Sequence, residues 1–179
     1  MSRSSPPLSS AETGAPPVGP LLFREGMSRV GGAVHVVTTD GPAGRAGFTA
    51  TAMTPVTDSP PSLLVCVNAA GRSATFLEAN GVFCVNTLAG DDIAVAEAFA
   101  GRADLHGQDR FTVGRWKRLV TGSPLLASCL VAFDCRVSDA RIVATHHVII
   151  GEIVAVHLGE NRPGLVYQGR AYHLLDDAI

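Results

Sequence analysis

The stretch that decides the fold lies between residues 47 and 68. It reads Gly47-Phe48-Thr49-Ala50-Thr51-Ala52-Met53, then Asp58-Ser59-Pro60-Pro61, then Leu63-Leu64-Val65-Cys66-Val67-Asn68. The first part alternates small apolar and hydroxyl residues with a period of two, which predicts a half-buried strand ending at Met53. The two prolines predict a turn, because each fixes φ and lacks an amide donor. The third part is apolar and predicts a strand buried on both faces.

The first of these strands has an unusual face. Its side chains are those of Thr and Ala, which are short. A flat ligand therefore has room to lie against the backbone, where N–H groups remain available to it. This strand is our first candidate for a binding surface.

Composition limits the class of protein. The chain has 179 residues, 46% of them hydrophobic and 17% charged, with a net charge of −2. This predicts one well-buried domain whose surface needs a partner, and it offers no electrostatic case for nucleic acid or an anionic membrane. The four cysteines lie in apolar runs without metal or redox spacing, so we expect reduced thiols in a cytoplasmic protein.

The beginning of the chain differs from the rest. Residues 1–20 are rich in Ser, Pro and Gly and contain no continuous apolar segment, so we expect a flexible tail and no secretory signal. Residues 21–179 are expected to form the single domain. Its apolar runs have the length of strands, which predicts no transmembrane segment.

The remaining pattern predicts many strands and a few short helices. Helices are expected at residues 21–30, at 73–81 with Ser73 as N-cap and Gly81 as terminator, and at 91–99. Strands are expected at 34–39 and 82–88, as an antiparallel pair at 130–137 and 148–158, and as a closing hairpin at 166–175. Without regular βαβ alternation, this order predicts a mostly β protein, a β-barrel with helical decoration.

Familiar catalytic motifs are missing from the sequence. It contains no Gly-x-Gly-x-x-Gly after a strand, no Walker loop, no nucleophile elbow and no His-Glu-x-x-His. His146 and His147 are neighbours in a predicted strand, so they point to opposite faces and do not share one ion. Trp116 stands among Arg115, Lys117 and Arg118, which we interpret as a surface loop because one basic cluster is weak evidence for nucleic acid.

The best polar constellation is the loop from Asn68 to Thr75. Arg72 supplies a cation, and Ser73 and Thr75 supply hydroxyls. The N–H groups at the start of the following helix point at an anion with the helix dipole behind them. A phosphate site and an ordinary capped surface helix both fit this pattern.

A second stretch carries a family resemblance. It reads Ala144-Thr145-His146-His147-Val148-Ile149-Ile150-Gly151-Glu152-Ile153. The chain resembles the short-chain flavin reductases that serve two-component monooxygenases, from about Phe23 to Leu174, and within them those of pyrimidine utilisation. That family has Gly-Asp-His before a strand of the form apolar-apolar-Gly-Glu/Arg-Val. His146 matches the signature His, whereas Ala144 and Thr145 replace Gly and Asp, so no carboxylate role is available at Thr145.

The resemblance implies an FMN-binding split β-barrel that forms a homodimer. It implies that FMN, with FAD as a second option, is reduced by NADH or NADPH and then passes to a transient oxygenase partner. His146 is the implied catalytic residue, on the nicotinamide side of the flavin. The implied flavin-binding residues are Thr49, Ala50, Thr51, Ala52, Met53, Asn68, Arg72, Ser73, Thr75 and Phe99.

Two other segments match the family's pattern. The loop from Phe99 to Phe111 is implied to cover part of the flavin or the nicotinamide. Tyr167, Arg170 and Tyr172 match the closing hairpin, in which we interpret Arg170 as a solvated edge residue. Two further functions stay open: a flavin-dependent reductase of a ferric chelate or corrinoid cobalt, and a flavin-binding electron carrier that does not turn over.

Overall fold

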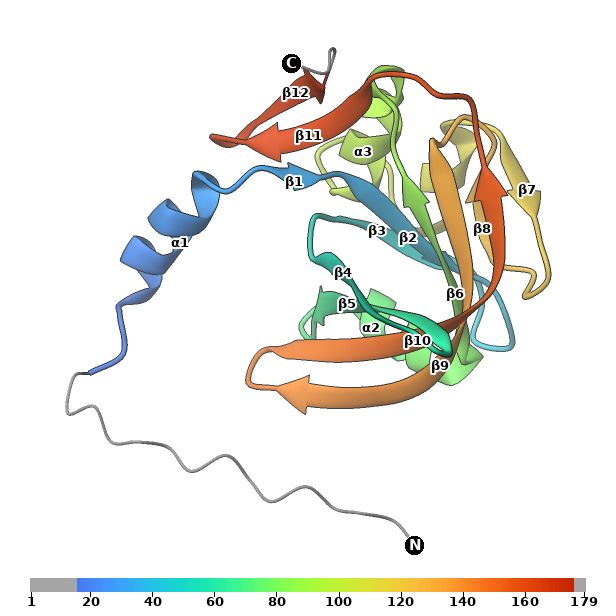
Figure 1. The fold of residues 1–179 in the computed structure, drawn as a ribbon, viewed down its shortest axis with the longest axis horizontal. Coiled ribbons are helices and arrows are strands. Elements are labelled where there is room, and N and C mark those ends of the chain that lie inside the picture. The colour runs from blue at the N-terminus through green and yellow to red at the C-terminus, as the bar shows by residue number, and fades with distance from the viewer. Residues whose placement is uncertain (1–15, 176–179) are drawn as a thin grey trace, which may run out of the picture.

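A computed structural model describes residues 16–175, so most of the expected tail at residues 1–20, and the last four residues, lie outside the described residues. Its main feature is a seven-stranded antiparallel sheet (Figure 1). In spatial order the strands are β3 (Ala46–Ala50), β2 (His35–Thr39), β6 (Val82–Thr87), β9 (Val131–Val143), β10 (His146–Leu158), β5 (Pro61–Asn68) and β4 (Met53–Asp58).

The two edge strands of this sheet are consecutive in the chain. Only Thr51 and Ala52 separate the end of β3 from the start of β4. In a flat sheet of seven strands the edges would be roughly 29 Å apart, whereas three Cα–Cα steps span at most about 11 Å. The sheet must therefore curl into a barrel, and Thr51 and Ala52 form its seam.

The seam corrects the strand expected to run on to Met53. The strand ends at Ala50, and the Met53 amide donates a hydrogen bond to the Thr51 carbonyl at 3.0 Å. The alternating pattern continues through the break because it reports local residue preference and carries no information about which strand each residue pairs with. The turn expected at the two prolines lies between β4 and β5, at Ser59 and Pro60, and Pro61 is already the first residue of β5.

The core consists of two clusters on opposite faces of β2, which is buried along its whole length. One lies under α3 (Ile93–Phe99) and contains Val34, Val36, Leu88, Phe99, Leu125 and Leu126. The other fills the barrel and contains Val37, Leu63, Val65, Leu77, Phe83 and Ile149. Burial of each large side chain contributes about 1.5–3 kcal/mol, so the two clusters hold β2 and its neighbour β3 rigidly in place.

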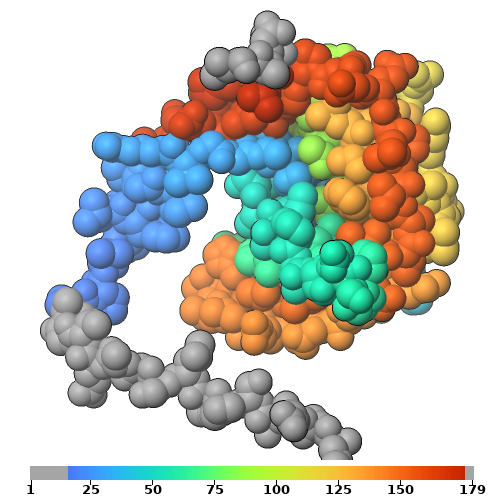
Figure 2. Space-filling view, in the orientation of Figure 1, coloured from blue at the N-terminus to red at the C-terminus, as the bar shows by residue number. Residues whose placement is uncertain are grey.

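The helices differ in how they pack. α2 (Arg72–Asn80) lies on the barrel and ends at Gly81, whose φ of 66° provides the left-handed terminator that we expected. A 3₁₀ turn, η1 (Gly90–Asp92), precedes α3. In contrast, α1 (Pro20–Ser28) stands away from the barrel and has no buried residue (Figures 1 and 2).

Smaller elements complete the fold. β1 (Gly32–Ala33), β11 (Gly164–Gln168) and β12 (Ala171–Leu175) form a three-stranded sheet that includes the expected closing hairpin. β7 (Trp116–Arg118) pairs with β8 (Pro124–Leu126), and η2 (Gly107–Thr112) lies in the preceding loop. The surface loop expected at Trp116 was therefore wrong: the indole packs on Phe99 and Phe111, with ring centroids 5.4 and 5.2 Å apart.

The predicted fold class and strand pair agree with the structure. The fold is mostly β with short helices, and β9 and β10 form the expected antiparallel pair. All four cysteines are free; three are buried and Cys66 is partly exposed. Across residues 16–175, no helix is both long and apolar enough to cross a membrane.

Candidate functional site

Most of the predicted site residues meet in one cavity of about 410 Å³, which we call the seam cavity because Thr51 and Ala52 line it. Its floor is the end of β3, and its other walls come from β5, the start of α2, the end of α3 and the start of β10. The lining residues are Phe48, Thr49, Ala50, Thr51, Ala52, Cys66, Val67, Asn68, Gly71, Ser73, Phe99, Ala100 and His146.

The floor is held by contacts to α3. The Thr49 hydroxyl donates to the Ala96 carbonyl at 2.6 Å, which fixes β3 against the helix. A Cβ at Gly47 would lie 2.8 Å from the Phe99 ring, so glycine is what allows the ring to lie against the strand. Within the described residues, the amides of Thr51 and Ala52 donate to no protein group, which leaves two donors at the seam.

His146 stands on the opposite wall. It pairs with Asn68 where β10 meets β5, and its Nδ1 lies 3.0 Å from the Thr145 hydroxyl. Thr145, which replaces the family's Asp, thus orients the imidazole of His146. His147 points to the other face, where its Nδ1 lies 2.5 Å from Glu78 Oε1. The expectation that the two histidines face apart is confirmed.

A second cavity of about 510 Å³ adjoins the first, and we call it the anion cavity. The two cavities share Gly71 and Ser73. Arg45, Arg72 and Arg110 line it, and among its described lining residues there is no carboxylate. Three guanidinium groups without a local counter-charge make this the part of the site that attracts an anion.

The arginines of the anion cavity are held in different ways. The Arg45 guanidinium lies 4.4 Å from the centroid of the Phe111 ring, and its Nε donates to Gln108 Oε1 at 2.8 Å. Arg110 Nε donates to the Leu105 carbonyl at 3.3 Å. Sequence reasoning missed Arg45, because it comes from a hairpin that only the fold brings to α2. Gln108 and Arg110 belong to the loop from Phe99 to Phe111 that the resemblance implied as a cover, but no anion was expected there.

The start of α2 corrects one expectation. The N-cap is Gly71 and not Ser73, and no side chain caps the helix. Asn68 causes the shift: its Oδ1 accepts from the Ala70 amide at 2.9 Å and its carbonyl accepts from the Gly71 amide, so the loop turns earlier. Over residues 16–175 the Ser73 hydroxyl makes no hydrogen bond, which leaves it available to a ligand.

Two predicted residues lie outside both cavities. Thr75 is exposed on α2 and lines neither of them. Met53 lines a groove of about 650 Å³ between α1 and the barrel. Its amide is also already bonded to Thr51. Met53, an implied flavin-binding residue, therefore has no free amide, and the free amides are those of Thr51 and Ala52.

One buried titratable group lies behind the floor. His35 of β2 pairs with Ala50 of β3, and its Nδ1 lies 3.0 Å from the Thr87 hydroxyl. Burial lowers the pKa of His35 to about 4, because the charged imidazolium is poorly solvated there. The ring is therefore neutral at pH 7 and adds no charge beneath the seam.

The shape of the site fits a flavin nucleotide in three respects. The small side chains of Ala50 and Ala52 leave a flat floor for a tricyclic ring. The free amides of the seam match the carbonyl acceptors at one end of such a ring. The anion cavity, entered past Ser73, matches a phosphate at the end of a sugar-alcohol chain.

Comparisons with known proteins agree with this geometry. Residues 27–176 match the flavin reductase like domain. The chain is 46% identical to the FMN reductase (NADH) RutF of Ancylobacter novellus over 175 residues, 97% of this chain and 96% of that protein.

Two solved structures extend the comparison. BorF, the flavin reductase component of a bacterial two-component tryptophan halogenase, superposes with a TM-score of 0.81 at 30% identity, covering 88% of this chain and 99% of that one. The NADH:FAD oxidoreductase of Streptomyces globisporus C-1027 gives a TM-score of 0.79 at 26% identity, covering 89% and 96%. The split-barrel expectation is confirmed.

Proposed function

The chain belongs to the flavin reductase family, and from that premise we propose that it reduces FMN with NADH and supplies the reduced flavin to a separate oxygenase. It is an oxidoreductase. The observation that carries the assignment of the site is the continuity of the seam cavity with the anion cavity through Gly71 and Ser73. The anion cavity also leaves room for the longer diphosphate tail of FAD.

When bound, the flavin would supply the hydride-accepting redox chemistry. The chain's own residues would position the flavin ring and polarise its carbonyl groups. Ala50 and Ala52 would support the ring, and the free amides of Thr51 and Ala52 would donate to its carbonyl oxygens. Because these amide donors are already in place before the reaction, they stabilise negative charge that develops on the ring. Hydride transfer therefore requires no acid–base pair of side chains.

His146 has a separate role in the proposal. It lies across the seam cavity from the β3 floor and is exposed at its mouth. From there it borders the face of the ring that the nicotinamide must reach. Phe99 and Ala100 line the cavity on the α3 side.

We further propose that the protein is a homodimer. α1 and the residue pair after it expose Leu21, Leu22, Phe23, Met27 and Val30, each at least 51% exposed. Such a row of apolar side chains marks an interaction surface. The groove of about 650 Å³ faces it, lined by Met53 and Pro55 of β4 (Figure 2). A second copy would fill this groove and place its own chain beside the seam.

One assay tests the proposed function. Purified protein given FMN and NADH in air should consume NADH at a rate that requires both protein and FMN. Absence of NADH consumption with a correctly folded protein would overturn the proposal. The relatives named above are described as flavin reductases, and a carrier without turnover would fail the same assay.

A further inference from the structure

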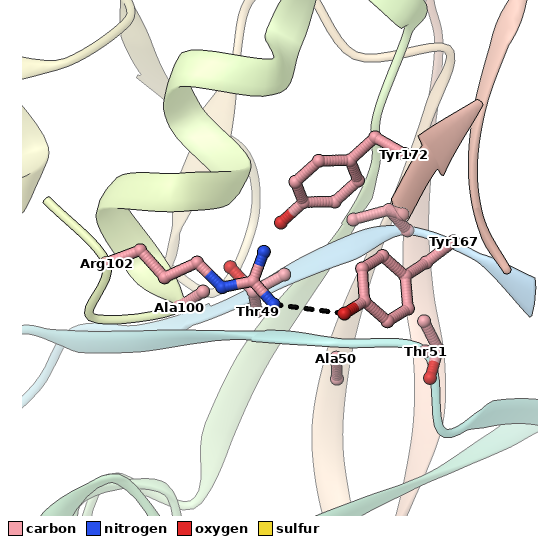
Figure 3. A pocket seen from close by; sticks show the side chains of 8 residues that line it. Thr49, Ala50, Thr51, Ala100, Arg102, Tyr167 and Tyr172 are labelled. Atoms are coloured by element: carbon pink, nitrogen blue, oxygen red, sulfur yellow. Dashed lines mark hydrogen bonds between the residues drawn. The ribbon is translucent and has the colours of Figure 1, made fainter. Parts of the chain in front are cut away.

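A third cavity, of about 200 Å³, opens beside the seam (Figure 3). It shares Thr49, Ala50, Thr51 and Ala100 with the seam cavity, so the two cavities have these walls in common. Its remaining walls are Val34, Arg102, Tyr167 and Tyr172. It lies toward β11 and β12, away from the anion cavity.

The guanidinium of Arg102 is held in this cavity by two aromatic rings. Its Nη2 donates to the Tyr167 hydroxyl at 3.0 Å, and its Cζ lies 5.6 and 5.7 Å from the ring centroids of Tyr167 and Tyr172. The two rings are themselves in edge contact at 5.2 Å. Figure 3 shows the guanidinium reaching across the strand toward both of them.

Arg102 is held but not saturated. One further contact, at 3.5 Å, joins its Nη1 to Glu97 on α3. A guanidinium has five N–H donors, so three remain for a ligand. Its side chain is 48% exposed, which leaves those donors accessible from solvent.

We propose that Arg102, held between Tyr167 and Tyr172, binds the diphosphate of the reduced pyridine nucleotide. This rests on the proposed function, because it assumes a hydride donor above the seam. Of the described residues that line the seam cavity and this third cavity, Arg102 is the one arginine or lysine. The arginines of the anion cavity lie at the other end of the site, where the flavin phosphate is placed.

The chemistry of the donor fits this position. The diphosphate of a dinucleotide is one ribose away from the nicotinamide, so a ring stacked over the seam brings the diphosphate to a neighbouring wall. A guanidinium binds such an anion through two parallel charge-assisted hydrogen bonds. The two tyrosines fix its plane in advance, which reduces the entropy lost on binding.

The test compares two hydride donors in the intact protein. NADH carries the diphosphate, whereas 1-benzyl-1,4-dihydronicotinamide has the same reactive ring and no phosphate. Arg102→Gln should raise KM for NADH by about tenfold to a hundredfold, the effect of losing a charge-assisted pair. Turnover with the phosphate-free donor and the Kd for FMN should stay at wild-type values. Arg118→Gln is the matched control. Arg118 lies on β7 and pairs with Asp40, so this variant removes an equal charge from another paired arginine.

Each other outcome has a defined meaning. An unchanged KM for NADH in Arg102→Gln overturns the inference, as does an equal loss with both donors. A raised Kd for FMN would also overturn it, since Arg102 would then hold the flavin. If the wild-type protein reduces FMN with neither donor, the proposed function fails instead. A thermal melt of each variant confirms that the folded protein is compared.

Discussion

His146 lies opposite Asn68 in the antiparallel pairing of β10 with β5, and both residues line the mouth of the seam cavity. The pairing is enforced from both sides. The Thr145 carbonyl accepts from the Ala69 amide at 2.9 Å, and Asn68 folds the loop that leads to α2. The same strand pair, β10 with β5, therefore positions both His146 and the start of the loop from Asn68 to Thr75.

The first prediction concerns His146. His146→Ala should leave the affinity for FMN nearly intact and lower kcat/KM for NADH by on the order of 10²-fold, because the nicotinamide loses a positioning contact. Steady-state kinetics and a thermal melt on one preparation measure this. His147→Ala is the matched control: it breaks the contact to Glu78 and should lower the melting temperature with normal kinetics. Wild-type kinetics in His146→Ala would assign it a structural role.

The second prediction concerns the anion cavity. Arg72→Ala combined with Ser73→Ala should weaken FMN binding by about 2–4 kcal/mol, since charge-assisted hydrogen bonds to a desolvated phosphate are lost. Titration by fluorescence quenching gives the Kd. Riboflavin lacks the phosphate, so its affinity should not change. Arg141→Ala, on an exposed residue of β9, is the control for net charge. An equal loss for both flavins would show that the phosphate binds elsewhere.

The third prediction concerns bulk at the seam. Ala52→Leu should lower flavin affinity while the variant still melts cooperatively, because a flat ring packs on this residue. Ala79→Leu places the same side chain on an exposed position of α2 and should bind flavin normally. Normal binding by Ala52→Leu would move the ring away from the seam.

The fourth prediction concerns assembly. Light scattering at micromolar concentration should give twice the chain mass of 18.6 kDa. Leu22→Ser with Phe23→Ser should shift the mass toward the monomer, because α1 loses its apolar face. Val120→Ser, on an equally exposed residue far along the chain, should not. A wild-type monomer that reduces flavin would contradict the homodimer.

The fifth prediction follows from His35. Its pKa is about 4 in the folded protein and 6.5 in a solvated chain, so the unfolded chain takes up a proton first as the pH falls. This contribution to stability is complete above pH 6.5 and is lost as the pH falls toward 4, by about 1.4 kcal/mol per pH unit. Urea unfolding at pH 7 and pH 5 should show a loss of about 2 kcal/mol that His35→Gln lacks. Equal losses in both proteins would exclude His35 as the cause.

The sequence predicted those parts of the fold that depend on local pattern. Several strands, the α2 terminator at Gly81 and the closing hairpin were marked by residues within each element, whereas β4, β7 and β8 were not predicted. The break at Thr51 was not predicted. It arises because β3 pairs with β2 whereas β4 pairs with β5, and strand pairing is not visible in the local pattern. Trp116 was misread for a related reason: its charged neighbours in sequence are not its neighbours in space.

The site was predicted in the same uneven way. Thr49 to Ala52, Asn68 and Ser73 are close in sequence and were found together, and the resemblance supplied His146 and Phe99. Arg45 was missed, and Arg110 was known only as part of the implied covering loop, because nothing in their own segments indicates an anion. Their role depends on a hairpin and a 3₁₀ turn meeting at the start of α2, which only the tertiary structure reveals.

The free thiols of this protein face an oxidant that its own product generates. Reduced flavin that is released in air reacts with oxygen and forms hydrogen peroxide. Burial raises the pKa of Cys129 to about 11 and that of Cys135 to about 12, and it raises the pKa of Cys84 as well. Peroxide oxidises the thiolate form, so these three residues are protected by remaining protonated. Cys66 is partly exposed and lines the seam cavity, where the bound flavin would cover it. Of the four thiols, Cys66 is thus the one whose access to peroxide would change when the seam cavity is filled.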